Sequence, residues 1–182
     1  MPKLIENVRT QLLQEAQRQV AERGYAKTTI RSVAEACGIA VGTVYNYFPS
    51  KDVLVASFMA ETWESCLSRI KLRDKASPKA FLRELYELLQ DFKERHRILL
   101  ADEEAEQSFE AVVAARHQLL RDQLAVLAAP VCADVPGTED GFASRFVAEA
   151  LLTWAVEGVP FAALWPYLAA AVSAPAMEEV GA

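Results

Sequence analysis

Residues 28–52 constrain the fold of this 182-residue chain more strongly than any other segment. They read TTIRSVAEACGIAVGTVYNYFPSKD, in which two short helical stretches, residues 29–37 and 41–48, flank a turn at Gly38. Pro49 ends the second stretch, and a longer helix is expected to begin directly after it. This layout is typical of a helix-turn-helix, whose second helix is of a size to enter a DNA major groove.

Apolar residues recur at helical spacing on both sides of this segment. In the first helix Leu12, Ala16 and Val20 stand four residues apart and form one stripe. Leu, Ala, Glu, Arg and Gln are abundant, and these residue types favour helices over strands. Further helices are predicted over residues 3–23, 51–72, 79–94, 96–101, 102–129, 141–157 and 161–173, with a loop at residues 130–140.

We therefore predict an all-α fold of about nine helices. An N-terminal three-helix, helix-turn-helix DNA-binding domain (residues 1–50) is expected to precede a helical domain (residues 51–182). Thr28 is the expected N-cap of the second helix and Ser50 that of the fourth, because short hydroxyl side chains accept hydrogen bonds from the first free N–H groups of a helix.

Charge is distributed unevenly along the chain, whose formal net charge is −6. Residues 1–51 hold seven basic and four acidic side chains, whereas the remainder holds twelve basic and twenty-one acidic ones. A basic end on an acidic body is what a phosphate-facing module with a separate second domain would show.

Cysteine and histidine are too few and too scattered for a metal site. Cys37, Cys66 and Cys132 have no metal-ligand spacing, and neither His96 nor His117 stands near them in the sequence. The sequence also contains no G-x-S-x-G segment and no phosphate-binding glycine loop. We therefore predict no metal, no cofactor, no catalytic residue and no enzyme activity.

No apolar run reaches the length that a membrane span requires. The longest apolar region, residues 159–176, is interrupted by Pro160, Pro166 and Pro175. No targeting segment precedes Lys3. A cytoplasmic protein without a membrane partner is expected.

The third helix carries two tyrosines that are hard to explain as solvated surface. Val44 and Phe48 are expected to face inward, which leaves Val41, Thr43, Tyr45 and Tyr47 wholly or partly outside. Tyrosine hydroxyls can bond phosphates while the rings pack against sugars or a thymine methyl. The alternative is that both tyrosines are ordinary half-buried aromatics.

Other residues are suited to contact DNA from the same side. Gly42 removes a side chain where the third helix would press closest to the groove. Lys51 stands in the first turn of the fourth helix, where free N–H groups and the positive helix end attract an anion. Thr29 and Arg31, at the start of the second helix, can hold the phosphate backbone in the same manner. For Arg31 the alternative is a solvated charge.

Residues 5–60 resemble the DNA-binding domain of the tetracycline-repressor (TetR) family of bacterial transcriptional regulators. The resemblance is carried by Gly24-Tyr25, Thr28-Thr29-Ile30, Val33-Ala34, Gly38-Ile39, Gly42-Thr43-Val44-Tyr45, Tyr47-Phe48, Ser50-Lys51 and Leu54. It implies that Arg31, Val41, Gly42, Thr43, Tyr45, Tyr47 and Lys51 face DNA. One departure is Ala40, where the family often has serine, so the third helix lacks a side-chain cap.

The resemblance further implies a helical second domain that dimerises through its last two helices and binds a small effector. Those two helices are apolar on more than one side, which independently indicates that a partner covers them. The expected dimer-interface residues are Phe142, Phe146, Leu151, Trp154, Phe161, Leu164, Trp165 and Leu168. For any one of them the alternative is a place in the core of its own subunit.

An effector pocket is expected among the fourth to seventh helices, for an apolar or amphipathic small molecule. Its expected lining is Trp63, Cys66, Phe81, Leu85, Tyr86, Leu89, Phe92, Phe109, Val113 and His117. Aromatic residues at helical spacing are more often plain core. The acidic run Asp102, Glu103, Glu104 and Glu106 is expected to be a solvated face, with a cationic ligand as the alternative.

These features together predict a ligand-responsive repressor. A homodimer would place two third helices in successive major grooves of a palindromic double-stranded DNA site, and an effector would release it. The main alternative is a DNA-binding homodimer without a small-molecule effector. An enzyme, or an interaction module that has lost DNA binding, fits the residues less well.

Overall fold

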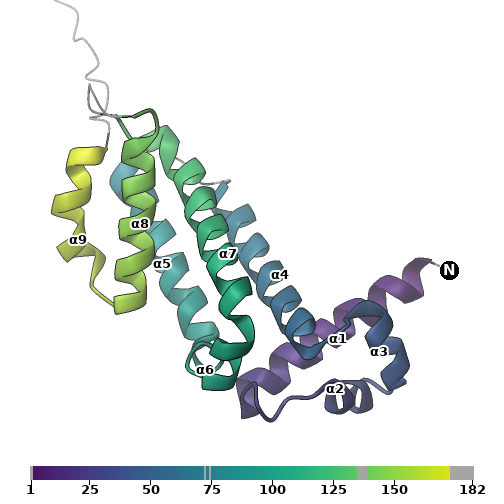
Figure 1. Ribbon diagram of the computed structural model, residues 1–182. Helices are drawn as coiled ribbons and strands as arrows, with labels where there is room; N and C mark the ends of the chain where they lie inside the picture. Colours follow the sequence, from purple (N-terminus) through teal and green to yellow (C-terminus); the bar gives the residue numbers. More distant parts are fainter. Residues whose placement is uncertain (1, 72, 74, 135–138, 173–182) are drawn as a thin grey trace, which may run out of the picture. The chain divides into compact units, whose positions relative to one another are not determined.

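The structure is a computed structural model that describes residues 2–71, 73, 75–134 and 139–172 (Figure 1). Side chains are described throughout these ranges except at residues 2–7, 104 and 106–117. The described residues form helices and connecting turns, with one isolated β-bridge between Cys132 and Val172, which confirms the all-α fold.

Nine α-helices and two short 3₁₀ helices lie within the described ranges. In chain order they are α1 (Pro2–Arg23), α2 (Ile30–Ala36), α3 (Val41–Tyr47), α4 (Lys51–Lys71), α5 (Pro78–Arg95), α6 (Arg97–Leu100), α7 (Glu103–Ala128), η1 (Ala129–Val131), α8 (Phe142–Glu157), α9 (Phe161–Leu168) and η2 (Ala169–Ala171).

The chain divides into two compact units, and the first consists of Met1–Cys66 and Lys93–Ala111. Its core is built from the apolar stripe of α1, the inner faces of α2 and α3, and the first turns of α4. The central side chains are Leu12, Ala16, Val20, Tyr25, Ile30, Val33, Val44, Phe48, Leu54, Val55 and Phe58, with Leu99 and Ala105 from the later segment. Burial of these side chains supplies most of the free energy that holds such short helices in place.

The second compact unit consists of Leu67–Phe92 and Val112–Ala182. The amphipathic helix α5 buries Phe81, Leu82, Leu85, Tyr86 and Leu89 and keeps its charged residues outside. α8 buries Val147, Ala148, Leu151 and Ala155, and α9 buries Leu164 and Leu168. The Tyr86 hydroxyl donates a hydrogen bond to the carbonyl of Val159, which joins α5 to the α8–α9 connection.

The first unit extends past residue 50, where the sequence predicted the DNA-binding domain to end. α4 contributes Leu54, Val55 and Phe58 to the same hydrophobic core as α1, so the packing continues across that position. The assignment of DNA binding to residues 1–50 and of other functions to residues 51–182 stays a prediction.

The N-cap of α2 is Thr29, so the prediction of Thr28 was wrong. Thr28 is buried, and its hydroxyl donates to the Gly24 carbonyl at 2.9 Å, which commits it to the preceding turn. Thr29 accepts the backbone N–H of Ser32 at 3.0 Å, and the Ser32 hydroxyl oxygen accepts the N–H of Thr29 at 3.1 Å. This reciprocal pair is a capping box.

α9 ends at Leu168, five residues before the predicted end. Pro166 offers no N–H to the helix, and the chain then tightens into the 3₁₀ turn η2. Val172 is extended and pairs with Cys132, while the N–H of Ala133 donates to the carbonyl of Ala171 at 3.1 Å. The β-bridge therefore takes the backbone groups that a longer helix would have used.

Candidate functional site

The turn at Gly38 fixes how α3 follows α2. Gly38 has a φ of +67°, a left-handed conformation that glycine adopts without strain. Its N–H donates to the Glu35 carbonyl at 3.1 Å, and the N–H of Ile39 donates to the Ala34 carbonyl at 2.9 Å. Within the first unit, α2 and α3 consequently follow one another as a helix-turn-helix beside α1 (Figure 1).

One face of α3 is held in the core and the opposite face is left outside. Val44 and the following Phe48 are buried, whereas the Tyr45 side chain is 50 % exposed. Tyr47 is half-buried, and its ring lies 6.4 Å from that of Phe48. The two tyrosines are thus unequal, because Tyr45 projects outward and Tyr47 partly supports the core.

Of the remaining predicted contacts on α3, Val41 packs partly against the core, as Tyr47 does. Val41 and Thr43 are half-buried, and Gly42 is exposed. Apart from its two chain neighbours and the backbone of α3 itself, no heavy atom lies within 4 Å of the place where a Cβ on Gly42 would stand, so packing within the chain does not demand glycine there. The N-cap residue Ala40 makes no side-chain cap, as the sequence indicated.

The residues predicted to bind the phosphate backbone of DNA lie at the starts of α2 and α4. Thr29 is the cap of α2, and Arg31 is exposed in its first turn. Ser50 caps α4 as predicted, since its hydroxyl oxygen accepts the N–H of Val53 at 3.2 Å. All eight residues predicted to contact DNA therefore belong to the first unit and stand on or beside α2, α3 and the start of α4.

Lys51 has close partners within the chain. Its ammonium nitrogen donates to the Tyr25 carbonyl at 3.2 Å and lies 3.6 Å from the centre of the Tyr25 ring. The Tyr25 hydroxyl donates in turn to the carboxylate of Asp52. The lysine is therefore held in one place at the start of α4, by contacts that the sequence did not reveal.

The residues predicted to line an effector pocket are described in part. Trp63 and Cys66 are buried in the first unit, while Phe81, Leu85, Tyr86 and Leu89 are buried in the second, where Phe92 is half-buried. The side chains of Phe109, Val113 and His117 lie outside the described residues. Tyr86 packs against Phe161, with ring centres 5.7 Å apart, and burial raises the pKa of its hydroxyl. These contacts give Tyr86 a packing role, and the pocket stays a prediction.

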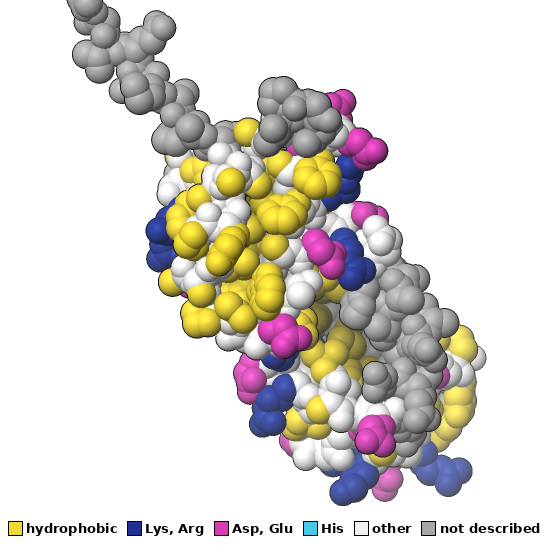
Figure 2. Space-filling view, turned by 60° about the vertical axis from the view of Figure 1, so that its left-hand side comes forward, with side chains coloured by type: hydrophobic (Ala, Val, Ile, Leu, Met, Phe, Trp, Pro, Cys, Tyr) yellow, Lys and Arg dark blue, Asp and Glu magenta, His cyan; other side chains and the backbone are white. Residues whose placement is uncertain are grey.

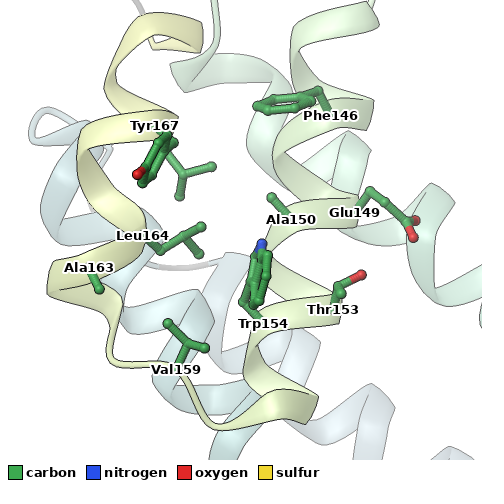
Figure 3. Close-up of a pocket in the computed structure, with 10 residues that line it drawn as sticks. Phe146, Glu149, Ala150, Thr153, Trp154, Val159, Ala163, Leu164 and Tyr167 are labelled. Atoms are coloured by element: carbon green, nitrogen blue, oxygen red, sulfur yellow. The ribbon is translucent and has the colours of Figure 1, made fainter.

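α8 and α9 present a broad apolar surface, visible where hydrophobic side chains gather in Figure 2. Between the two helices lies an open groove of about 620 Å³. Phe146 and Trp154 of α8 and Tyr167 of α9 point into it, whereas Glu149 extends away from α9 (Figure 3). Glu149 forms an ion pair with Arg121 of α7.

Only part of the predicted dimer face is exposed. Phe142, Phe146 and Trp154 are exposed, and Phe161 and Trp165 are half-buried. Leu151 is wholly buried among its own helices, so its assignment to that face was wrong. Leu164 and Leu168 are also buried and reach the surface only as lining of the groove.

Tyr167, which is 73 % exposed, was missed by the sequence reasoning. The available signal was its position three residues after Leu164, which was itself predicted to lie at the dimer interface.

Among the described residues, no helix is both long and apolar enough to cross a membrane. The same residues contain no group of three or more His, Cys, Asp or Glu side chains that could hold a metal ion.

Residues 12–58 match the model of the family described as bacterial regulatory proteins, tetR family. The transcriptional repressor KstR of Rhodococcus jostii is 48 % identical over 48 residues, which cover 26 % of this chain and 23 % of KstR. The transcriptional regulator TtgR of Pseudomonas putida is 32 % identical over 92 residues, 49 % of this chain and 43 % of TtgR. The aligned part of the chain thus spans less than half the length of these curated relatives.

The similarity to solved structures extends over nearly the whole chain. A TetR transcription regulator from Haloarcula marismortui covers 92 % of this chain, and the match covers 100 % of that protein, with a TM-score of 0.62 and 20 % identity. At this identity the likeness concerns the fold.

Proposed function

Because this chain belongs to the TetR family of bacterial regulatory proteins, we propose that it is a ligand-responsive transcriptional repressor that binds a palindromic DNA site as a homodimer. The observation that carries the DNA-binding part is the outward face of α3, which presents the half-exposed Tyr45 beside Gly42 and Thr43. A helix of this kind reads base edges while neighbouring groups hold phosphates. Arg31 and Lys51 are the cations proposed to bind the phosphates.

The apolar surface of α8 and α9 supports the homodimer. Phe146, Trp154 and Tyr167 are exposed and border one groove, and exposed apolar side chains that gather in one place are typical of a protein–protein contact. Two copies related by a twofold axis would bury the groove in a four-helix contact. The dimer would place its two α3 helices about one DNA turn apart, roughly 34–36 Å.

Release by an effector is proposed to follow from a shift between two conformations of this dimer. An effector changes DNA affinity only by the difference in its own affinity for the two conformations, commonly about 1–3 kcal/mol. KstR is a transcriptional repressor, which supports repression as the outcome here.

The DNA-binding claim is tested by selecting bound duplexes from a random library with the full chain. We expect enrichment of one inverted repeat. Replacement of Tyr45 by alanine should reduce the enrichment without changing the thermal unfolding of the protein. A library that stays random with the folded wild-type chain would refute sequence-specific binding.

A second candidate is a DNA-binding homodimer without an effector. The burial of Leu85 and Tyr86, and the bond from Tyr86 to the Val159 carbonyl, are what a plain packed core would show. Operator affinity measured with and without a panel of apolar and amphipathic compounds separates the two. A compound that weakens DNA binding at least tenfold supports the repressor with an effector, and a panel without effect favours the second candidate.

A further inference from the structure

Asp102, the residue just before α7, is joined to the turn that follows α1. One carboxylate oxygen, Oδ2, accepts the backbone N–H of Tyr25 at 3.1 Å and that of Ala26 at 3.3 Å. The other oxygen, Oδ1, accepts the N–H of Ala105 at 3.1 Å and so caps α7. Asp102 therefore holds two segments of the first unit that are separated by more than 70 positions in the sequence.

The backbone at Gly24 makes this contact possible. Gly24 has a φ of +84°, and a Cβ placed on it would lie 3.5 Å from the Asp102 carboxylate. The left-handed turn directs the next two N–H groups toward that carboxylate, and a residue with a side chain would be strained in this conformation.

Lys51 binds the same peptide group from its other end. The peptide between Tyr25 and Ala26 offers its carbonyl to the Lys51 ammonium at 3.2 Å and its N–H to Asp102. A cation thus contacts the oxygen of one peptide and an anion contacts its N–H. Hydrogen bonds arranged in such a chain polarise and strengthen one another, and those to charged groups are the stronger kind.

The Tyr25 side chain closes the arrangement. It is buried, its ring lies under the Lys51 ammonium, and its hydroxyl bonds Asp52 at the start of α4. Movement of Tyr25 would therefore shift the support of Lys51. α7, which Asp102 caps, continues along the chain from this unit into the second.

We propose that Asp102 and Tyr25 are positioning residues for Lys51, so that the α6–α7 junction controls how well this lysine holds a DNA phosphate. The inference rests on the proposed DNA binding and deepens it by naming the chain of contacts through which that binding is regulated. With Asp102 in place, the Lys51 ammonium is held in position to bind a phosphate. Without the negative charge of Asp102, the peptide between Tyr25 and Ala26 is less polarised, and the Lys51 ammonium is less restrained.

The test is a double-mutant cycle on DNA affinity, measured with a mixed-sequence duplex over a range of salt concentrations. The chains are the wild type, Asp102→Asn, Lys51→Met and the double variant, with Glu103→Gln as the control for loss of a neighbouring exposed carboxylate. Asparagine also caps helices well, so α7 should remain intact.

We expect Asp102→Asn to weaken binding about threefold or more, and to make the salt dependence shallower by up to about 0.9 in the log–log slope for each lost phosphate contact. The double variant should bind no more weakly than Lys51→Met alone, and Glu103→Gln should match the wild type. A purely structural role for Asp102 would instead give the same loss in both Lys51 backgrounds, and would leave the slope unchanged.

The proposal is overturned by an equal loss of affinity in both Lys51 backgrounds or by an unchanged salt slope. It is also overturned if Asp102→Asn binds DNA with the affinity of the wild type. Asp102→Ser serves as a second variant where the first unfolds, because serine caps the helix but carries no charge. Failure of the proposed function is a separate outcome, in which the folded wild-type chain binds no duplex even in low salt.

Discussion

At the scale of single residues, exposure separates side chains that the sequence could not rank. Tyr45 and Tyr47 are two residues apart on α3, yet Tyr45 projects into solvent while Tyr47 packs partly against the core. An exposed tyrosine is free to bond a phosphate or a base edge. We therefore predict that Tyr45 contributes more to DNA affinity than Tyr47 does.

Tyr45→Ala should weaken binding to the selected duplex about tenfold, since a hydrogen bond to a charged group contributes about 1.5–3 kcal/mol. Fluorescence anisotropy measures the affinity, and thermal unfolding should change little because the side chain is exposed. Tyr45→Phe, which keeps the ring, serves as the matched variant. Equal affinity of all three chains would remove Tyr45 from the interface.

His96 gives the first unit a dependence on pH. The side chain is buried against Phe58, with ring centres 6.1 Å apart. This burial, with a smaller contribution from the charge of Arg95, lowers the pKa of His96 below its usual value of 6.5. The folded chain therefore resists protonation that the unfolded chain accepts.

The free energy of unfolding should accordingly fall as the pH drops from about 6.5 through the lower pKa of the folded state. Denaturant unfolding at a series of pH values measures this change in the free energy of unfolding. His96→Gln should lose the part of the pH dependence that comes from the histidine. A His96→Gln chain with the same pH dependence as the wild type would show that other groups cause it.

At the scale of elements, the sequence predicted the helices well because the apolar spacing is regular. The ends of helices depend on contacts that spacing does not reveal. Thr28 and Thr29 are equally good caps by residue type. The bond from Thr28 to Gly24 and the reciprocal bonds between Thr29 and Ser32 decide between them. The dimer-face prediction failed at Leu151 because helices apolar on several sides do not show which side a neighbour covers. Asp102 was read as solvated because its partners are distant in sequence.

The stability of α3 can be increased at its start, because Ala40 stands at its N-cap in an extended conformation without a side-chain bond. Ala40→Ser should stabilise the protein by about 1 kcal/mol through a new cap. Thermal or denaturant unfolding checks this, and Thr29→Ala, which removes the cap of α2, should shift stability the opposite way. An Ala40→Ser chain no more stable than the wild type would indicate that the end of α3 is held by other means.

At the scale of the whole molecule, the proposed mode of DNA binding requires two subunits. The apolar surface of α8 and α9 is the proposed interface, and its exposed aromatic residues are the kind that dominate such contacts. Charge placed on this surface should separate the subunits while leaving each one folded.

Trp154→Glu should therefore weaken dimerisation by at least about thirtyfold, which corresponds to a loss of about 2 kcal/mol at a central aromatic residue. Sedimentation over a range of concentrations measures the dissociation constant. Val126→Glu is the matched control, because Val126 is also exposed but lies on α7, away from the groove. Unchanged dimers of Trp154→Glu would place the interface elsewhere.

Symmetric presentation of α3 by two subunits is tested by the stoichiometry of the DNA complex, measured by sedimentation on duplexes carrying either two inverted half-sites or one. Presentation of α3 by a symmetric pair of subunits predicts two chains on the complete site, with centres about 10 base pairs apart or a multiple of that, and much weaker binding to the single half-site. A single chain bound with equal affinity to both duplexes would contradict it.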